Sequence, residues 1–412
     1  MVTRVAFLTC VYPPYPGGMG MAAKGMAEEA LRHGYEVEVF APHLVTNMPR
    51  PYHGNERVKI NNFRLVHANE KGAGEKMAAD AQLRGVVKTT ELVPLVRYGN
   101  SAILPQLIWR MRSFDIIHLF YPFFGAAELL PIIRRTTKAK IIVHHIMDAV
   151  AEGWLGKFFS WHRRYLLPTI LRHSDLVLDM SEDFFRGSDF GATRKLWAEV
   201  PMDFLPLGVD TNLFQPAEKK NHDVQAIIFV GGLDRAHYFK GIPVLLRSLE
   251  ILRKKGLKFR CLIVGGGDMK KDYETLAGKL GLLEGAVIFG GLVPNEKLPD
   301  YYCSADIFVM PSTARVESFC IAAAEAQACG LPAIVSDFPG VRVTIEDRVT
   351  GFRVRPGDIK DLTEKLATLL QDTKLREDMG VRGRERMVQK YDWEVVGRKL
   401  DEIYRKLIPY ES

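Results

Sequence analysis

Glu317 and Glu325 are two carboxylates whose spacing could serve the binding of one extended ligand. Residues 319–329 are rich in alanine and are followed by Gly330, which predicts a helix that ends at that glycine. Glu317 then lies just before the helix and Glu325 lies within it. Since eight helical residues rise about 12 Å, the two carboxylates would span roughly the distance from a hexose, across a diphosphate, to a ribose. A nucleotide sugar would fit this arrangement.

The elements around this helix predict where a diphosphate would bind. Apolar residues 306–310 and 333–336 are typical of buried strands, so the unit is a strand, a loop, a helix and a strand. The start of the helix offers free backbone N–H groups and the positive end of a dipole, which together favour an anion. Two glutamates eight residues apart are common, however. A buried alanine-rich helix with two solvated glutamates is the alternative interpretation.

The flanking residues carry a resemblance to a known family. Glu317, seven intervening residues and Glu325, followed by Ala328-Cys-Gly-Leu-Pro332, resemble the signature of family 4 retaining glycosyltransferases. The resemblance implies the α/β GT-B fold, in which two doubly wound Rossmann-like domains face each other across a cleft and a C-terminal helix crosses back to the first domain. It also implies that Glu317 approaches hydroxyls of the transferred sugar and that Glu325 accepts both ribose hydroxyls.

The same resemblance assigns Ser318, Phe319, Cys320 and Ile321 to the donor site, where backbone N–H groups would hold the phosphate and the sugar. Relatives usually carry glycine where this chain has Cys320. A side chain there would narrow the donor pocket, so the resemblance does not fix the identity of the donor.

Length and composition are those of a soluble globular protein. The 412 residues predict two or three domains, and 47% hydrophobic and 25% charged residues are ordinary values. The N-terminus lacks the apolar core of a signal peptide, and no stretch approaches the length of about 18 uncharged apolar residues that a membrane-spanning helix needs. The five cysteines are odd in number and show no metal-ligand spacing, which predicts free thiols in a reducing cytoplasm.

The net charge of +7 is concentrated in the first half of the chain. Residues 1–200 contain 25 Lys and Arg against 19 Asp and Glu, whereas residues 201–412 contain 31 against 30. This bias fits an anionic membrane surface or an acidic acceptor, and an ordinary solvated basic surface fits it equally well. Residues 154–172 mix aromatic and basic side chains and could contact lipid headgroups, but we favour an amphipathic helix with its aromatics packed inward. For residues 92–111 we likewise favour core packing over an interfacial helix.

A glycine loop follows the first predicted strand, at residues 4–10. Gly18, Gly20 and Ala23 loosely match the dinucleotide-binding fingerprint. A proline-rich insert of seven residues separates the strand from these glycines, whereas the fingerprint turns directly off its strand. In family 4 enzymes a proline-rich Gly-Gly loop at this place faces the donor phosphates. The resemblance therefore assigns Gly17 and Gly18 to donor binding.

Two histidines end the predicted strand at residues 140–145. Ligands of parallel sheets meet the carboxyl ends of strands, so a histidine there could hydrogen-bond a sugar hydroxyl or be oriented by Asp148. Many relatives carry a histidine at this strand end, near the donor sugar. We favour His145 as the catalytic candidate over His144. An alignment shifted by one residue, or a satisfied structural histidine, are the alternatives.

The alternation of strands and helices restarts near residue 226, after the polar linker 218–223. Relatives usually carry an arginine after the first glycine of the next loop and a lysine before the later one, and both hold the donor diphosphate. Lys240 matches that lysine, whereas Gly232 stands at the position of the arginine. Arg235, three residues on, is our candidate for the missing charge.

The segment 287–293 resembles the part of family 4 enzymes that contacts the nucleotide base. Leu292 and Val293 are the candidates for this contact, and the identity of the base cannot be read from them. The glycine triplet at residues 265–267 is interpreted as a turn rather than a cofactor loop.

These features divide the chain into an acceptor-binding domain at residues 1–204, completed by a helix at 391–412, and a donor-binding domain at 205–390. The expected function is a retaining transfer of a hexose-type sugar from a nucleotide-diphosphate sugar to a glycan, lipid or small-molecule acceptor. The expected location is cytoplasmic, with peripheral attachment to the inner face of a membrane. The resemblance implies no metal and no cofactor besides the donor, the sequence has no Asp-x-Asp spacing, and no nucleic-acid partner is expected.

Two other function classes compete with this interpretation. A nucleotide-sugar epimerase of the same fold would act without an acceptor. A non-catalytic nucleotide-sugar-binding subunit is the second alternative, and the glycine at position 232 leaves room for it. A NAD-dependent enzyme fits less well because of the insert before Gly18.

Overall fold

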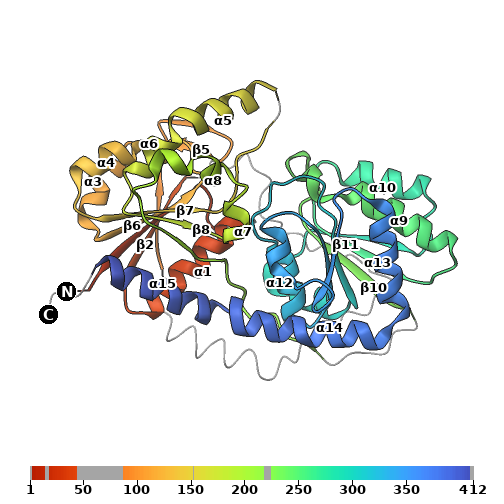
Figure 1. Cartoon of the computed structure of the whole chain (residues 1–412). Helices are drawn as coiled ribbons and strands as arrows, with labels where there is room; N and C mark the ends of the chain where they lie inside the picture. The colour runs from red at the N-terminus through yellow and green to blue at the C-terminus, as the bar shows by residue number, and fades with distance from the viewer. Residues whose placement is uncertain (1, 14–17, 44–86, 152, 218–223, 409–412) are drawn as a thin grey trace.

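The computed structural model describes residues 2–13, 18–43, 87–151, 153–217 and 224–408, which form two parallel β-sheets covered by helices (Figure 1). Each sheet belongs to its own half of the molecule, and the two halves face each other (Figure 1). This architecture confirms the predicted α/β class with two doubly wound, Rossmann-like units.

In the described residues, the first sheet has seven parallel strands in the order β3-β2-β1-β6-β7-β8-β9. Helices cover both faces of such a sheet, so its central strands are apolar along their length, and β6 is buried at every residue. The strands are β1 (Arg4–Leu8), β2 (Glu36–Pro42), β3 (Lys88–Leu92), β6 (Ile116–Tyr121), β7 (Lys140–His145), β8 (Leu176–Asp179) and β9 (Met202–Phe204).

The second sheet has six described parallel strands in the order β12-β11-β10-β13-β14-β15. Its strands are β10 (Ala226–Val230), β11 (Arg260–Val264), β12 (Val287–Gly291), β13 (Ile307–Met310), β14 (Ala333–Ser336) and β15 (Gly351–Val354).

The helices that pack on these sheets follow the alternation expected from the sequence. In the first half they are α1 (Gly18–Arg32), α3 (Leu107–Arg110), α4 (Leu130–Thr136), α5 (Gly153–Tyr165), α6 (Leu167–Arg172), α7 (Glu182–Phe185) and α8 (Asp189–Thr193). In the second half they are α9 (Ile242–Lys254), α10 (Lys270–Lys279), α11 (Leu298–Cys303), α12 (Ile321–Ala328), α13 (Ile359–Gln371) and α14 (Thr373–Arg386), and α15 (Trp393–Leu407) follows. None of the described helices is both long and apolar enough to span a bilayer.

Each sheet has one point where the strand order reverses its direction. In the first sheet this point lies between β1 and β6, and in the second it lies between β10 and β13. Ligands of doubly wound sheets bind outside the carboxyl ends of the strands at such points. The loops after β1, β10 and β13 lead to Gly18, Lys240 and Glu317. All three residues therefore follow the carboxyl end of a strand that borders a reversal point, where a ligand is expected to bind.

The C-terminal helices join the two halves, as the fold class predicts. α14 lies along the second half, and a π-helical turn at Met387–Tyr391 redirects the chain into α15, which packs on α1 of the first half (Figure 1). Gly25 of α1 lies so close to α15 that a Cβ there would be 2.3 Å from the indole of Trp393. The hydroxyl of Tyr35 donates a hydrogen bond to Asp401 at 2.8 Å.

One prediction for the first half is confirmed in part and another is wrong. Leu92, Leu104, Leu107 and Met111 pack in the core, as favoured for residues 92–111. Between them, β4 (Val96–Tyr98) and β5 (Ser101–Ile103) form an antiparallel hairpin. Side chains alternate between the faces of such a hairpin, so Ala102 is buried while Val96 and Tyr98 are exposed. The helix α5 is present, but four of its aromatic side chains point outward instead of inward.

Candidate active site

Lys240 and Glu317 form an ion pair where the loops after β10 and β13 meet. The ammonium Nζ of Lys240 donates to Oε1 of Glu317, and the hydroxyl of Ser312 donates to the other carboxylate oxygen at 3.3 Å. Burial alone would lower the pKa of Lys240, but the charge and hydrogen bond of Glu317 act together with the nearby Cys320 and Asp234, and the net effect is a raised pKa. The site therefore holds a protonated cation beside a carboxylate.

Backbone contacts fix the position of Lys240. It ends a 3₁₀ segment at Arg235–Lys240, and Gly241 follows with a φ of +76°. A Cβ on Gly241 would lie 1.9 Å from the carbonyl oxygen of Pro311, so only glycine fits there. Thr313 then donates its backbone N–H to the carbonyl of Phe239 at 2.6 Å. These contacts hold the lysine loop against the segment that leads to Glu317.

The start of α12 is open to an anion. The helix begins at Ile321, two residues later than predicted. Glu317 lies in the loop before it, so only part of the chain between Glu317 and Glu325 is helical. Cys320, the residue before the helix, makes no side-chain cap. Among the described residues, no group accepts the N–H of Phe319 or Cys320, whereas Ile321 N–H reaches the carbonyl of Phe319 at 3.1 Å. Unpaired amides at a helix start are suited to a phosphate.

The N-terminus of α1 lies against this site from the other half of the molecule. A Cβ on Gly18 would be 3.2 Å from Cδ1 of Ile321, so the starts of α1 and α12 approach each other across the boundary (Figure 1). The positive ends of two helix dipoles thus converge. Gly17, the other glycine predicted to bind the donor, lies outside the described residues.

Glu325 is held by a partner that was not predicted. The hydroxyl of Tyr302, on α11, donates to Oε2 of Glu325 at 2.8 Å, and both side chains are buried. Burial raises the pKa of Glu325 to about 7, although the hydrogen bond from Tyr302 acts in the opposite direction. The sequence alone gives no indication of the contact between Tyr302 and Glu325. The two residues lie on different helices, α11 and α12, which only the folded chain brings together.

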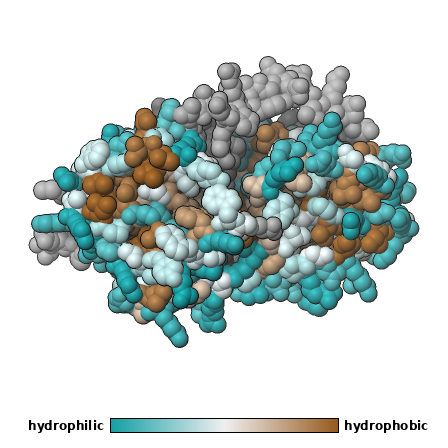
Figure 2. Space-filling model, turned by 90° about the horizontal axis from the view of Figure 1, so that it is seen from above, coloured by the Kyte–Doolittle hydropathy of each residue, from teal (hydrophilic) through white to brown (hydrophobic). Residues whose placement is uncertain are grey.

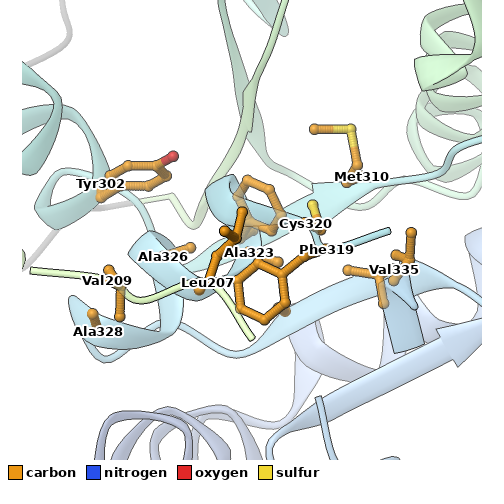
Figure 3. Close-up of a cluster of buried hydrophobic side chains, with 14 of the residues drawn as sticks. Leu207, Val209, Tyr302, Met310, Phe319, Cys320, Ala323, Ala326, Ala328 and Val335 are labelled. Carbon is orange, nitrogen blue, oxygen red and sulfur yellow. The ribbon is translucent and has the colours of Figure 1, made fainter. Parts of the chain in front are cut away.

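Phe319 and Cys320 lie in a buried apolar cluster beneath the start of α12 (Figure 3). The Phe319 ring packs near that of Tyr391 at 5.4 Å, and burial raises the pKa of the Cys320 thiol to about 12. The side chains of Phe319 and Cys320 therefore hold the loop in place. Only their backbone N–H groups remain available to a ligand. Whether Cys320 narrows the donor pocket stays a prediction.

His145 is fully buried at the end of β7, between two carboxylates. Its Nδ1 donates to Asp179 at 2.7 Å and its Nε2 donates to Asp148 at 3.1 Å, while its ring stacks on Phe190 with centroids 3.9 Å apart. Burial alone would lower the pKa of His145, but the two carboxylates raise it to about 9. The residue is thus an imidazolium whose two N–H groups are both engaged.

His144 points to the opposite side of the sheet. Its ring nitrogens lie 3.1 Å from His118 and 3.1 Å from the carbonyl of Leu205, and burial lowers its pKa to about 3. His118 in turn contacts the hydroxyl of Tyr404 on α15. His145, through Asp148, is the histidine that faces Arg315 of the second half.

Asp148 links His145 to the second half. Its Oδ2 lies 3.7 Å from a guanidinium nitrogen of Arg315, which also donates to the carbonyl of Phe184 at 3.4 Å. Burial would raise the pKa of Asp148, but the hydrogen bond and charge of His145 lower it. Arg315 was not among the predicted residues, although its position two residues before Glu317 is a signal that could have found it.

Two further contacts join the halves around the site. The hydroxyl of Ser318 donates to the carbonyl of Ile146, so this predicted donor residue contacts the first half. Arg342 forms an ion pair with Asp183 on α7, and the N–H of Gly340 also donates to Asp183, at 2.9 Å. The halves are therefore in direct polar contact beside the start of α12.

The structure does not place Arg235 beside Lys240. Arg235 is 84% exposed and lies 3.5 Å from Asp268. At Gly232, the position where relatives carry arginine, a Cβ would lie 2.7 Å from Nδ1 of His237. His237, which also contacts Asp234, thus occupies the space next to Gly232. Its imidazole is a second candidate for a phosphate contact that was missed.

Leu292 and Val293 follow β12 and lie beside the glycine triplet. Leu292 is exposed, and a Cβ on Gly266 would be 2.6 Å from its Cγ. Val293 is half-buried against the core. A Cβ on Gly265 would lie 1.9 Å from the carbonyl of Gly231, so the glycines let two loops approach closely. Among the described residues, no cluster of three or more His, Cys, Asp or Glu side chains could hold a metal.

Comparisons with known proteins agree with this geometry. The family model for "Glycosyl transferases group 1" matches residues 210–386. The chain is 32% identical over 327 residues to the GDP-mannose-dependent alpha-(1-6)-phosphatidylinositol monomannoside mannosyltransferase of Mycolicibacterium smegmatis, covering 75% of this chain and 83% of that protein. It is 33% identical over 419 residues to an uncharacterized glycosyltransferase of Methanocaldococcus jannaschii, covering 98% of each.

Solved structures share the fold at lower identity. A sucrose-phosphate synthase from Thermosynechococcus elongatus superposes with a TM-score of 0.75 at 21% identity, over 98% of this chain and 99% of that chain. Anabaena HepE in complex with UDP and glucose superposes with a TM-score of 0.68 at 16% identity, over 98% and 99%.

Proposed function

This chain belongs to the group 1 family of glycosyl transferases, the family 4 enzymes of GT-B fold, and from that premise we propose that it transfers a hexose-type sugar from a nucleotide-diphosphate sugar to an acceptor. One observation carries the proposal furthest: the Lys240–Glu317 ion pair lies beside the open start of α12. A cation, free amides and a carboxylate in one place suit a diphosphate joined to a sugar.

Donor binding would rearrange that ion pair. The phosphates would take the ammonium of Lys240 and the N–H groups of Phe319 and Cys320, which have no acceptor among the described residues. Glu317, released from Lys240, would accept hydrogen bonds from hydroxyls of the sugar. Glu325 would accept the ribose hydroxyls. We assign residues 205–390 to donor binding, and residues 1–204 with 391–412 to the acceptor.

We propose that the transfer retains the anomeric configuration and needs no metal. In a front-face reaction, the bond from the anomeric carbon to the phosphate oxygen breaks, and the acceptor oxygen bonds to the same face. The acceptor proton passes to the departing phosphate. Lys240 and the two converging helix starts would stabilise the charge that develops on the diphosphate. His145, as a buried cation beside Asp148, would position the first half of the site.

The name of one relative supports a proposal for the acceptor class. The Mycolicibacterium smegmatis protein is named for GDP-mannose as donor and a phosphatidylinositol mannoside as acceptor. We propose GDP-mannose as the first donor to test and a lipid-linked or small polyol acceptor, with the enzyme acting on the cytoplasmic side of a membrane.

A thermal-shift screen against nucleotide sugars and free nucleotides tests the proposal. A ligand of the folded state raises the melting temperature according to its concentration relative to Kd, so one base and sugar should stand out. Product analysis with that donor then reports the anomeric configuration. A nucleotide sugar that binds but is only epimerised, or a panel with no binder at all, would contradict the proposal.

A further inference from the structure

Four aromatic side chains form an exposed stripe along α5. Trp154, Phe158, Trp161 and Tyr165 are 70%, 40%, 49% and 57% exposed. Their spacing of four, three and four residues places them on one face of the helix. Neighbouring rings are in contact: Phe158 and Trp161 have centroids 6.1 Å apart, and Trp161 and Tyr165 6.2 Å apart. Exposed aromatics in a continuous row are unusual for a surface that contacts only water.

The opposite face of α5 fixes the rotation of the helix. Phe159 stacks on Phe124 with centroids 5.1 Å apart and an interplanar angle of 12°. The buried His162 contacts Glu128, and Arg163 donates to Asp189 at 2.7 Å. Because these contacts hold the inner face, Trp154, Trp161 and Tyr165 point away from the first half. The ring of Phe158 lies at the edge of the stripe, with its centroid 6.4 Å from that of Phe124. α5 lies at the outer edge of that half, at the top of Figure 1.

The charge on the exposed face is entirely basic. α5 contains no Asp or Glu, and Lys157 and Arg164 lie beside the aromatic stripe, with Arg164 5.8 Å from the Tyr165 ring centroid. Within the part of the chain that the structure describes, no acidic side chain pairs with either of them. The surface therefore combines aromatic rings with cations that lack a counter-charge.

We propose that the outward face of α5 binds the surface of an anionic lipid bilayer. Trp and Tyr prefer the headgroup region of a bilayer, and basic side chains near it are attracted to anionic lipids. Seen from above, the hydrophobic residues of the molecule form separate patches among hydrophilic ones rather than one broad apolar face (Figure 2). The contact is thus an interfacial helix lying on the bilayer.

A protein partner fits this face less well. Protein interfaces are enriched in aromatic residues and arginine but depleted of lysine, whereas Lys157 lies beside the rings here. The complementary surface would have to be negative over its whole length, as an anionic bilayer is. A second copy of the chain would instead bring like charges together.

The position of α5 connects the bilayer to the site. α5 follows β7, whose carboxyl end carries His145, and Arg163 of α5 holds Asp189, whose backbone N–H donates to Asp148 at 2.9 Å. A helix attached to the bilayer would bring this edge of the first half close to lipids. The inference goes beyond the proposed function, because binding to vesicles requires no sugar transfer.

Flotation of the full chain with vesicles tests the proposal. We expect flotation with phosphatidylcholine vesicles containing about a third phosphatidylglycerol, and little with pure phosphatidylcholine. Trp154→Ser/Trp161→Ser and Lys157→Glu/Arg164→Glu should each reduce binding about tenfold or more. Matched controls are Trp109→Ser, at a tryptophan on α3 that is 55% exposed, and Arg110→Glu/Arg112→Glu in the same half; both should float like the wild type.

Each other outcome overturns the proposal. These are no flotation of the wild type, equal flotation with neutral vesicles, or α5 variants that float normally. A concentration-dependent dimer that the α5 variants abolish would assign the face to a second copy. Thermal shifts with the donor should be unchanged in the α5 variants, so a failure of this proposal and a failure of the proposed function remain distinguishable.

Discussion

The hydroxyl of Tyr302 donates a hydrogen bond to Glu325 at 2.8 Å inside the second half of the molecule. Glu325 is the carboxylate proposed to accept the ribose hydroxyls, so Tyr302 orients it. Tyr302→Phe keeps the ring and removes only the donor. We expect nucleotide affinity to fall about fivefold, the effect of one lost hydrogen bond, as measured by calorimetry with a nucleoside diphosphate.

The neighbouring tyrosine is the control for this prediction. Tyr301→Phe makes the same chemical change one residue away, where no contact with Glu325 exists among the described residues. Equal losses in both variants would mean that the hydroxyl of Tyr302 has no specific role in nucleotide binding.

Glu325 itself should make stability and binding depend on pH. Burial raises its pKa to about 7 from the ordinary 4.5. Between these values the folded protein retains a proton that the unfolded chain releases, so Glu325 increasingly destabilises the fold as the pH rises through this window. Glu325→Gln should therefore gain melting temperature over the wild type from pH 5 to pH 8 while losing nucleotide affinity.

Wild-type nucleotide affinity should also rise through about pH 7, because only the carboxylate accepts both ribose hydroxyls. Glu296→Gln, an exposed glutamate before α11, is the control and should change neither property. A melting-temperature difference that is constant with pH would show that Glu325 does not titrate in this range.

Lys240 should contribute to the affinity for a nucleoside diphosphate but hardly to the affinity for the nucleoside alone. Lys240→Ala removes the cation that pairs with Glu317, so we expect nucleoside diphosphate affinity to fall about 10- to 100-fold and nucleoside affinity to fall less than about twofold. Calorimetry with both ligands measures the ratio. Lys255→Ala, at an exposed lysine after α9, serves as the control. A parallel loss for both ligands would place Lys240 away from the phosphates.

The local elements of the site were predictable because they depend on neighbouring residues. Apolar runs and an alanine-rich segment between them specified β13, α12 and β14, and Gly330 ended the helix as expected. The start of α12 was predicted two residues too early. Phe319 is turned into the apolar cluster below the helix, and this tertiary contact is not encoded in helix propensity.

Contacts between distant segments were not predictable. Tyr302 with Glu325 and Arg342 with Asp183 join segments that only the folded chain brings together. The direction of the α5 aromatics was predicted wrongly for the same reason. An amphipathic pattern does not show which face packs inward, and the stacking of Phe159 on Phe124 decides it.

The second side chain that contacts the diphosphate is predicted to be His237 rather than Arg235. His237 lies where a side chain at position 232 would extend, whereas Arg235 is exposed and beside Asp268. His237→Ala should weaken nucleoside diphosphate binding about three- to tenfold, and Arg235→Ala should change it less than about twofold. Calorimetry on both variants decides between them, and a larger loss in Arg235→Ala would restore the original assignment.

His145 should behave as a buried cation that holds the first half of the site together. The carboxylates of Asp179 and Asp148 raise its pKa to about 9, above the ordinary 6.5, so its stabilising effect is complete below pH 6.5 and is lost as the pH rises through 9. His145→Gln removes one partner of a buried charge cluster and should cost about 3–5 kcal/mol in the free energy of unfolding at pH 6, and less at pH 9.5.

Urea unfolding at the two pH values measures this difference between His145→Gln and the wild type. His144→Gln is the matched control, since the pKa of His144 is lowered to about 3 and that side chain is neutral in the folded protein across the range. The unfolded chain still protonates His144 near pH 6.5, so the cost of His144→Gln should rise slightly from pH 6 to pH 9.5, opposite in direction to that of His145→Gln. If His145 instead contacted the sugar directly, His145→Gln would keep the wild-type stability at both pH values and lose turnover alone. A pH-dependent loss of stability that His144→Gln does not share assigns His145 to positioning Asp148, through which the first half meets Arg315.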